Sequence, residues 1–171
     1  MRRKSLLVDI DSCYGCYTCE VACKQEHELP VGPRWIRVTK VGPKRVAGKL
    51  SMYFYPVHCM HCSVPACKEA CPEDAIEQRA DGVVLYLKEK CTGCMNCVEA
   101  CPFGAPQYNP ETNLVDKCNL CVDRIDRGEL PACVHHCPTD AIFYGDPNEF
   151  TARMQKQVAH KIIDRHLRRE V

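Results

Sequence analysis

The sequence has no long apolar run, no excess of one charge and no familiar catalytic motif. No stretch of the 171 residues approaches the length of a membrane-spanning helix, so we expect any membrane contact to be made through a partner. The formal net charge is +1 and the basic residues are scattered, which gives no support to nucleic-acid binding. The chain lacks a Ser-His-Asp set, a paired-carboxylate site, a Gly-rich phosphate loop and an HExxH motif, so we expect no substrate chemistry on it.

The amino terminus lacks the features of an export signal. Residues 1–11 (MRRKSLLVDID) have too few apolar residues for a secretory signal, and no apolar segment follows Arg2-Arg3 as it would in a twin-arginine signal. Reduced thiols also suit the cytoplasm. We therefore expect a cytoplasmic protein.

Material for an ordinary hydrophobic core is scarce, because the chain contains sixteen cysteines and twelve prolines. The cysteines form four groups of four, and none is left over. The groups are Cys13, Cys16, Cys19 and Cys23; Cys59, Cys62, Cys67 and Cys71; Cys91, Cys94, Cys97 and Cys101; and Cys118, Cys121, Cys133 and Cys137.

The spacing within the groups is that of bacterial ferredoxins. The first and third groups read C-x2-C-x2-C-x3-C, whereas the second and fourth widen the middle gap to four and eleven residues. Three closely spaced thiolates on a tight loop can bind three corners of a cubane cluster. The fourth cysteine, which precedes a proline in three of the groups, binds the other cluster of a pair in two-cluster ferredoxins. Each group is therefore expected to link two [4Fe–4S] clusters.

Two other uses of cysteine fit the sequence less well. A disulfide framework is typical of short secreted chains. Zinc sites use four thiolates as two separated C-x2-C pairs and have no use for a third cysteine at the same spacing. If clusters fill much of the core, folding should be coupled to their insertion, and four clusters of about −2 each bring the net charge to roughly −7.

Short strands are predicted between the cysteine groups. Trp35 to Val41 alternates like a strand that Gly42-Pro43 stops, and Leu50 to Val57 can pair with it in a hairpin. Gly82 to Lys88 (GVVLYLK) is the most strand-like run, and Asp81-Gly82 supplies a turn before it. Trp35 is expected to be a packing residue, with a partner contact as the alternative.

A helix is predicted at the carboxyl end. Asp146, Pro147 and Glu149 are typical of a helix start with a capping box. This helix can pack against its own domain or dock on a partner. An apolar stripe then follows at near-helical spacing, made of Phe150, Met154, Val158, Ile162 and Leu167.

Two further patterns bear on the sites. Asp74-Ala75-Ile76 and Asp140-Ala141-Ile142 follow Cys-Pro in two groups and indicate an internal repeat. Four histidines flank cysteines, but sixteen thiolates already fill sixteen cluster corners, so we expect these histidines to tune potential or to lie at the surface. They are His58, His61, His135 and His136.

Three segments resemble a known family. They are residues 58–72 (HCMHCSVPACKEACP), 91–108 (CTGCMNCVEACPFGAPQY) and 117–146 (KCNLCVDRIDRGELPACVHHCPTDAIFYGD). They resemble the four-cluster electron-transfer subunits of molybdenum or tungsten bis-pterin oxidoreductases, such as dimethyl-sulfoxide, polysulfide, thiosulfate and arsenate reductases and formate dehydrogenases. The resemblance covers roughly residues 7–146.

The resemblance implies an α+β fold of two bacterial 2[4Fe–4S] ferredoxin-like units, one inserted in the other. The outer unit would be residues 1–50 plus 109–148, the inserted unit residues 51–108, and the amphipathic helix residues 149–171. It also implies four ligand sets: Cys13, Cys16, Cys19 and Cys137; Cys23, Cys118, Cys121 and Cys133; Cys59, Cys62, Cys67 and Cys101; and Cys71, Cys91, Cys94 and Cys97.

The function that the resemblance implies is a non-catalytic relay of single electrons. The partners would be a molybdenum or tungsten bis-pterin catalytic subunit and a second redox partner, either a quinone-linked membrane subunit, a flavoprotein or a soluble carrier. Relatives without their own signal can be exported beside a catalytic subunit, so a periplasmic location is the alternative. We see no carboxyl-terminal membrane anchor of the kind that some formate dehydrogenases use. A free-standing polyferredoxin and a regulatory or structural iron–sulfur protein are the other hypotheses.

Overall fold

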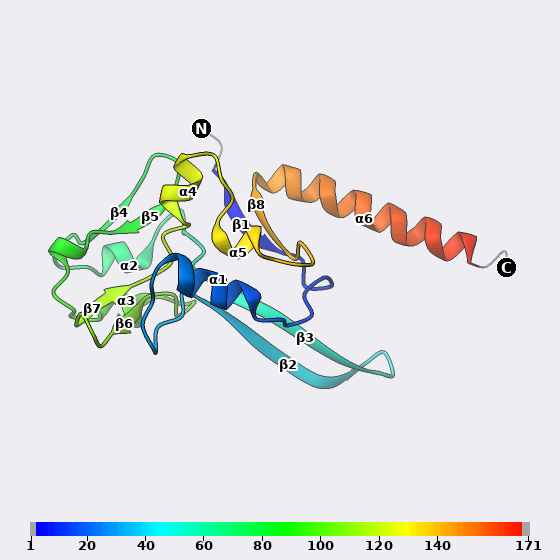
Figure 1. The fold of residues 1–171 in the computed structure, drawn as a ribbon, viewed down its shortest axis with the longest axis horizontal. Coiled ribbons are helices and arrows are strands. Elements are labelled where there is room, and N and C mark those ends of the chain that lie inside the picture. The colour runs from blue at the N-terminus through cyan, green and yellow to red at the C-terminus, as the bar shows by residue number, and fades with distance from the viewer. Residues whose placement is uncertain (1–2, 169–171) are drawn as a thin grey trace.

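The computed structural model describes residues 3–168, whose strands form four separate two-stranded antiparallel sheets (Figure 1). Three sheets are hairpins of consecutive strands, whereas the fourth joins the first strand of the chain to the last. The pairs are β1 (Ser5–Val8) with β8 (Ile142–Gly145), β2 (Ile36–Val46) with β3 (Lys49–His58), β4 (Ile76–Gln78) with β5 (Val84–Tyr86), and β6 (Gln107–Asn109) with β7 (Leu114–Asp116).

Most of the helices are short, and four of them begin at a cysteine motif. In each of α1, α2, α3 and α5 the third cysteine of a motif is the second residue of the helix. Together with the short strands, they make a small α+β fold. The helices are α1 (Thr18–Glu26), α2 (Ala66–Glu69), α3 (Asn96–Ala100), α4 (Val122–Asp126), α5 (Ala132–His135) and α6 (Pro147–Leu167), and a 3₁₀ turn covers Lys88–Lys90.

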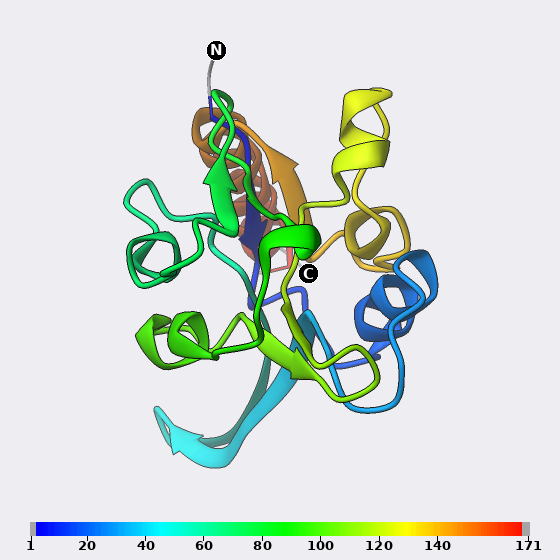
Figure 2. The same ribbon diagram turned by 90° about the vertical axis from the view of Figure 1, so that its left-hand side faces the viewer.

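The short helices pack in two pairs. Helix α1 packs against α5 beside the β1–β8 sheet, and α2 packs against α3. Figure 1 shows α2, α3 and the strands β4 to β7 at one side of the molecule, and Figure 2 views the molecule from that side. Segments distant in the sequence are thus brought together in both pairs.

The β2–β3 hairpin is longer than the sequence predicted and extends away from the rest of the chain (Figure 1). The hairpin itself is confirmed, but the prediction that Gly42-Pro43 ends the first strand is wrong, since β2 runs on to Val46. The register shifts between Val41 and Lys44, so the two intervening residues leave the ladder while the pairing continues beyond them. The strand predicted from Gly82 to Lys88 is confirmed as the shorter β5, which pairs with β4, and Lys88 belongs to the 3₁₀ turn instead.

Helix α6 begins as predicted and projects from the body of the molecule (Figure 1). Both hydrogen bonds of the capping box at Asp146 and Glu149 are present. Phe150 contacts the Phe143 ring at 5.9 Å between centroids, whereas Ile162 is 61% exposed. The aromatic contact with the body thus lies near the start of the helix, and an ion pair between Lys161 and Asp11 at 3.5 Å joins the helix to the body further along. Residues 169–171, the end of the predicted helix, lie outside the described residues. Within residues 3–168 no helix is both long and apolar enough to cross a membrane.

Cysteines form a large part of the buried interior. Trp35 is 7% exposed and lies in the main core cluster, which confirms it as a packing residue. Its ring lies 4.6 Å from that of His27 between centroids. The buried cysteines are Cys19, Cys23, Cys59, Cys67, Cys97, Cys118, Cys121 and Cys133.

Candidate iron–sulfur sites

The four motif loops share one backbone feature. In each motif, the residue just before the second cysteine has a positive φ, and in the second and fourth motifs its backbone N–H points at the first cysteine. The His61 N–H lies 3.4 Å from Cys59 Sγ, and the Leu120 N–H lies 3.4 Å from Cys118 Sγ. The loops thus form a repeated cradle for sulfur. The four residues are Gly15 (75°), His61 (44°), Gly93 (73°) and Leu120 (62°).

Close packing explains why two of these positions are glycine. A Cβ added to Gly93 would lie 2.3 Å from the backbone oxygen of Asn113, and one added to Gly15 would lie 2.4 Å from the Phe54 ring. The cysteine spacing alone did not predict the left-handed conformation at His61 or Leu120. The internal repeat also extends to the backbone, since Asp74 and Asp140 both have positive φ before β4 and β8.

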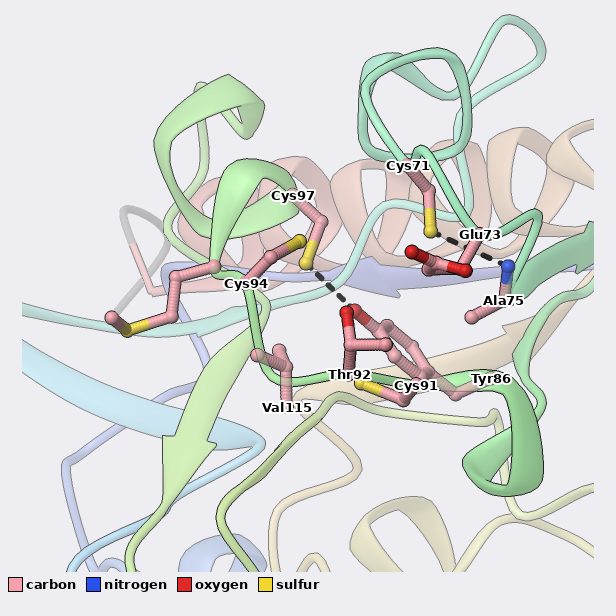
Figure 3. Close-up of a pocket in the computed structure, with 10 residues that line it drawn as sticks. Cys71, Glu73, Ala75, Tyr86, Cys91, Thr92, Cys94, Cys97 and Val115 are labelled. Atoms are coloured by element: carbon pink, nitrogen blue, oxygen red, sulfur yellow. Dashed lines mark hydrogen bonds between the residues drawn. The ribbon is translucent and has the colours of Figure 1, made fainter.

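Three cavities are each bordered by four cysteines, three from one motif and one from another, and Figure 3 shows the one bordered by Cys71, Cys91, Cys94 and Cys97. The space between the lining atoms, part of it open to solvent, is similar at the three, about 310, 290 and 250 Å³. Among residues 3–168, no group of three or more His, Cys, Asp or Glu side chains is placed to hold a single metal ion. In the same order, the cavities are site A (Cys13, Cys16, Cys19 and Cys137), site C (Cys59, Cys62, Cys67 and Cys101) and site D (Cys71, Cys91, Cys94 and Cys97).

The other four cysteines come together in the core, where we call them site B (Cys23, Cys118, Cys121 and Cys133). Burial raises the pKa of Cys133 well above its usual value, and the neighbouring Cys118 and Cys23 raise it further. Burial also raises the pKa of Cys23, again with Cys118 and Cys121 as the nearest charges. The structure therefore brings together the same groups of cysteines that the resemblance implied. Ligation of a cluster by each group stays a prediction.

The thiols fit an iron–sulfur cluster in number, type and surroundings. Burial raises the pKa of Cys19 to about 12 and that of Cys67 to about 11, so these groups are protonated thiols until a metal stabilises the thiolate. Thiolates are the soft ligands that such clusters require. The Ala75 N–H points at the sulfur of Cys71 at 3.3 Å, as the His61 N–H does at that of Cys59.

Two side chains that sequence reasoning missed contact cysteine sulfurs. The Tyr86 hydroxyl lies 2.7 Å from Cys97 Sγ in site D (Figure 3). Burial and the adjacent Cys97 raise the Tyr86 pKa, so the hydroxyl keeps its proton, and either atom can be the donor in this contact. His27 Nε2 lies 3.2 Å from Cys121 Sγ in site B. Neither contact had a signal in the sequence, because each joins residues from different elements.

The histidines flanking the cysteines have different surroundings. His58 and His61 are buried, at 3% and 5% exposure, whereas His135 and His136 lie at the surface. His58 Nδ1 is 2.9 Å from the Cys59 carbonyl oxygen, and His61 Nδ1 accepts a hydrogen bond from the Val84 N–H at 3.0 Å.

A buried lysine is the other residue that the sequence did not single out. Lys117 is 2% exposed and borders site C. Its Nζ donates to the carbonyl oxygens of Val84 and Cys118, the latter at 3.0 Å. Its position beside Cys118 places a positive charge between sites B and C.

Repeated sulfur-binding loops and cysteine-bordered cavities define an iron–sulfur protein. The 4Fe-4S dicluster domain family matches residues 50–147. The B subunit of polysulfide reductase from Wolinella succinogenes is 36% identical, over 94% of this chain and 85% of the relative. The thiosulfate reductase electron transfer subunit of Salmonella typhi is 38% identical, over 94% and 83%.

A third relative, the nitrate-inducible formate dehydrogenase iron-sulfur subunit of Escherichia coli, is 37% identical over 90% of this chain and 58% of its own length. The chain therefore belongs to the 4Fe-4S dicluster family of iron–sulfur electron-transfer subunits. It is an electron-transfer subunit of an oxidoreductase complex and not a catalytic subunit.

Proposed function

We propose that sites A, B, C and D each hold one [4Fe–4S] cluster and that the chain conducts single electrons along them. The observation that carries this proposal is that each cavity is bordered by three cysteines of one motif and one of another. Such clusters, when bound, supply one-electron chemistry at potentials set by hydrogen bonds, charge and burial. The protein's residues hold the clusters near one another and shield them from water.

The order of the relay is A, B, C, D. Sites A and B share helix α1, which carries both Cys19 and Cys23. Sites C and D share the second motif, through Cys67 and Cys71. Sites B and C lie next to each other. Burial raises the pKa of Cys118 in site B to about 12, and Cys59 of site C is the neighbouring charge that contributes most to this increase.

The two ends of this order are the most accessible. Cys16 of site A and Cys94 of site D are the two exposed cysteines among the sixteen. Electron transfer between proteins requires clusters near the surface, so these ends are the contact points for two redox partners.

The same pairings support a nested arrangement of units. Pairing of β1 with β8 and packing of α1 against α5 support an outer ferredoxin-like unit of residues 1–50 and 109–148. Packing of α2 against α3 supports an inserted unit of residues 51–108. Each unit would hold two clusters.

The partners are proposed from the names of the relatives. The polysulfide reductase B subunit and the thiosulfate reductase electron transfer subunit are components of reductases, which favours a subunit over a free-standing polyferredoxin. We infer a molybdenum or tungsten bis-pterin catalytic subunit at one end and a second redox subunit at the other, in a cytoplasmic complex. Purification from native cells tests this, since a free monomer that reduces several enzymes would contradict it.

Two measurements on the full chain, purified anaerobically, test the clusters. Iron content should approach sixteen atoms per chain, because four cubanes hold four irons each. Cys23→Ser should remove the same electron paramagnetic resonance signal as Cys121→Ser, and Cys13→Ser should remove a different one. A plateau near twelve irons contradicts four filled sites, and loss of the Cys13→Ser signal in Cys23→Ser contradicts the exchange of fourth ligands.

A further inference from the structure

Site C is bordered by two buried polar side chains that are not thiols, Lys117 and His61. Lys117 comes from the segment before motif four and His61 from the loop of motif two. Both contact Val84, which lies in β5: its carbonyl oxygen accepts from Lys117 and its N–H donates to His61. One backbone residue therefore orients both side chains beside the cavity.

The bond from Val84 fixes the tautomer of His61. Its Nδ1 accepts a hydrogen bond, so a neutral ring carries its proton on Nε2. Because Nδ1 accepts this bond it bears no proton, so the ring is the neutral form that carries its N–H on Nε2. Among the described residues, the buried Nε2 has no hydrogen-bond partner. An unpartnered buried donor beside a cysteine-bordered cavity indicates an acceptor within that cavity.

Lys117 contributes a charge. Its ammonium group has three N–H bonds, two of which go to neutral carbonyl oxygens, and among the described residues it forms no ion pair. A buried cation without a carboxylate is costly unless another negative group compensates it. Lys117 lines the same cavity as Cys59 and Cys67, so its charge lies beside the site C cysteines.

We propose that Lys117 and His61 are positioning residues that raise the reduction potential of site C, at the junction with site B. An electron that enters site C comes from an adjacent cluster, which is oxidised by one electron, and it adds one negative charge to the cavity. A fixed positive charge and an N–H donor stabilise that added charge, and no proton needs to move. The inference rests on the proposed function, because it requires a cluster on the site C cysteines.

A purely structural role makes a different prediction. If these side chains only anchor Val84, their replacement changes stability or cluster content and leaves the potentials of intact clusters unchanged. Midpoint potentials therefore distinguish the two roles, and iron content identifies variants that have lost a cluster.

The experiment is a redox titration of the full, cluster-loaded chain followed by electron paramagnetic resonance. Cys62→Ser first assigns the site C signal by its loss. Lys117→Met should then move the site C potential to more negative values, Lys117→Arg should return it toward the original value, and the sites A and D potentials should stay unchanged. Lys40→Met is the matched control, because Lys40 is exposed on the β2–β3 hairpin.

His61→Asn is a second, independent variant. Asparagine tolerates positive φ, and its side-chain oxygen can replace Nδ1 as acceptor for Val84, while nothing replaces Nε2. The site C potential should become more negative in this variant too. If Lys117→Met loses the site C cluster, the potential of His61→Asn tests the proposal by itself. Sixteen irons with an unmoved site C potential in the variants would overturn this inference alone. Twelve irons in the unmodified chain would instead contradict the proposed function.

Discussion

At the scale of single residues, the sites are built by backbone conformation as much as by cysteine. Each motif has a left-handed residue before its second cysteine, in two motifs its N–H points at sulfur, and hydroxyl and imidazole groups supply further contacts. Because such hydrogen bonds tune the potential of a cluster, we expect the four proposed sites to differ chemically even though each consists of four cysteines.

Gly93→Ala should abolish site D, and Gly128→Ala is its matched control. Both glycines have positive φ, 73° and 79°, so alanine costs about 1–2 kcal/mol at either position. Only at Gly93 would the new Cβ also collide with a backbone atom, the Asn113 oxygen at 2.3 Å. Iron content should fall from sixteen toward twelve in the first variant and stay at sixteen in the second. Equal iron content in the two variants would show that the collision is relieved without loss of the site.

The sequence predicted the cysteine groups because their spacing is local and specific. It did not predict Tyr86, His27 or Lys117, each of which meets a sulfur or a cavity through folding of distant segments. The expectation that flanking histidines act on clusters without ligating them led to His61, but its hydrogen-bond partner Val84 lies more than twenty residues away.

At the scale of elements, the molecule carries two projections, the β2–β3 hairpin and helix α6 (Figure 1). Leu50 on the hairpin is 71% exposed and Ile163 on the helix is 55% exposed. Local signals predicted the start of α6 well, since a capping box depends only on neighbouring residues. They placed the end of β2 too early, because continued pairing with β3 depends on a segment that follows the turn.

Asp146→Ala should loosen the start of α6 without affecting the clusters. The Asp146 side chain accepts a hydrogen bond from the Asn148 N–H at 2.7 Å, and loss of such a cap costs about 1 kcal/mol. Amide hydrogen exchange in the first turns of the helix should become several-fold faster, while iron content stays at sixteen. Asp164→Ala, on an exposed position of the same helix, is the control and should leave exchange in the first turns unchanged. Loss of iron in Asp146→Ala would mean that the helix supports site A.

At the scale of the whole molecule, the clusters take the place of a hydrophobic core. Half of the sixteen cysteines are buried, and the main core cluster contains Cys59, Cys118 and Cys133 beside Ile36 and Leu120. Strands of three or four residues contribute little stability in two-stranded sheets. We therefore expect the fold as a whole to depend on the clusters proposed for its interior.

Removal of iron should unfold the body of the protein. Anaerobic chelation leaves buried thiols with no ligand to organise them, so the β1–β8 sheet and the α1–α5 pair should lose protection from hydrogen exchange together. Far-ultraviolet circular dichroism should keep a helical contribution from α6, whose cap and hydrogen bonds are local. An iron-free chain with protected β1 and β8 amides would contradict this dependence on clusters.

The pairing of β1 with β8 also governs the order of events during synthesis. Val8 leaves the ribosome roughly 130 residues before its partner Ile142, a delay on the order of ten seconds at ordinary rates of translation. Throughout that interval the first strand has no edge to join, and the first cysteine motif is exposed to the solvent without Cys137. The thiols of the first motif must therefore stay reduced and free of metal until the last motif has been synthesised. We expect cellular assembly factors to protect the amino-terminal end during this time.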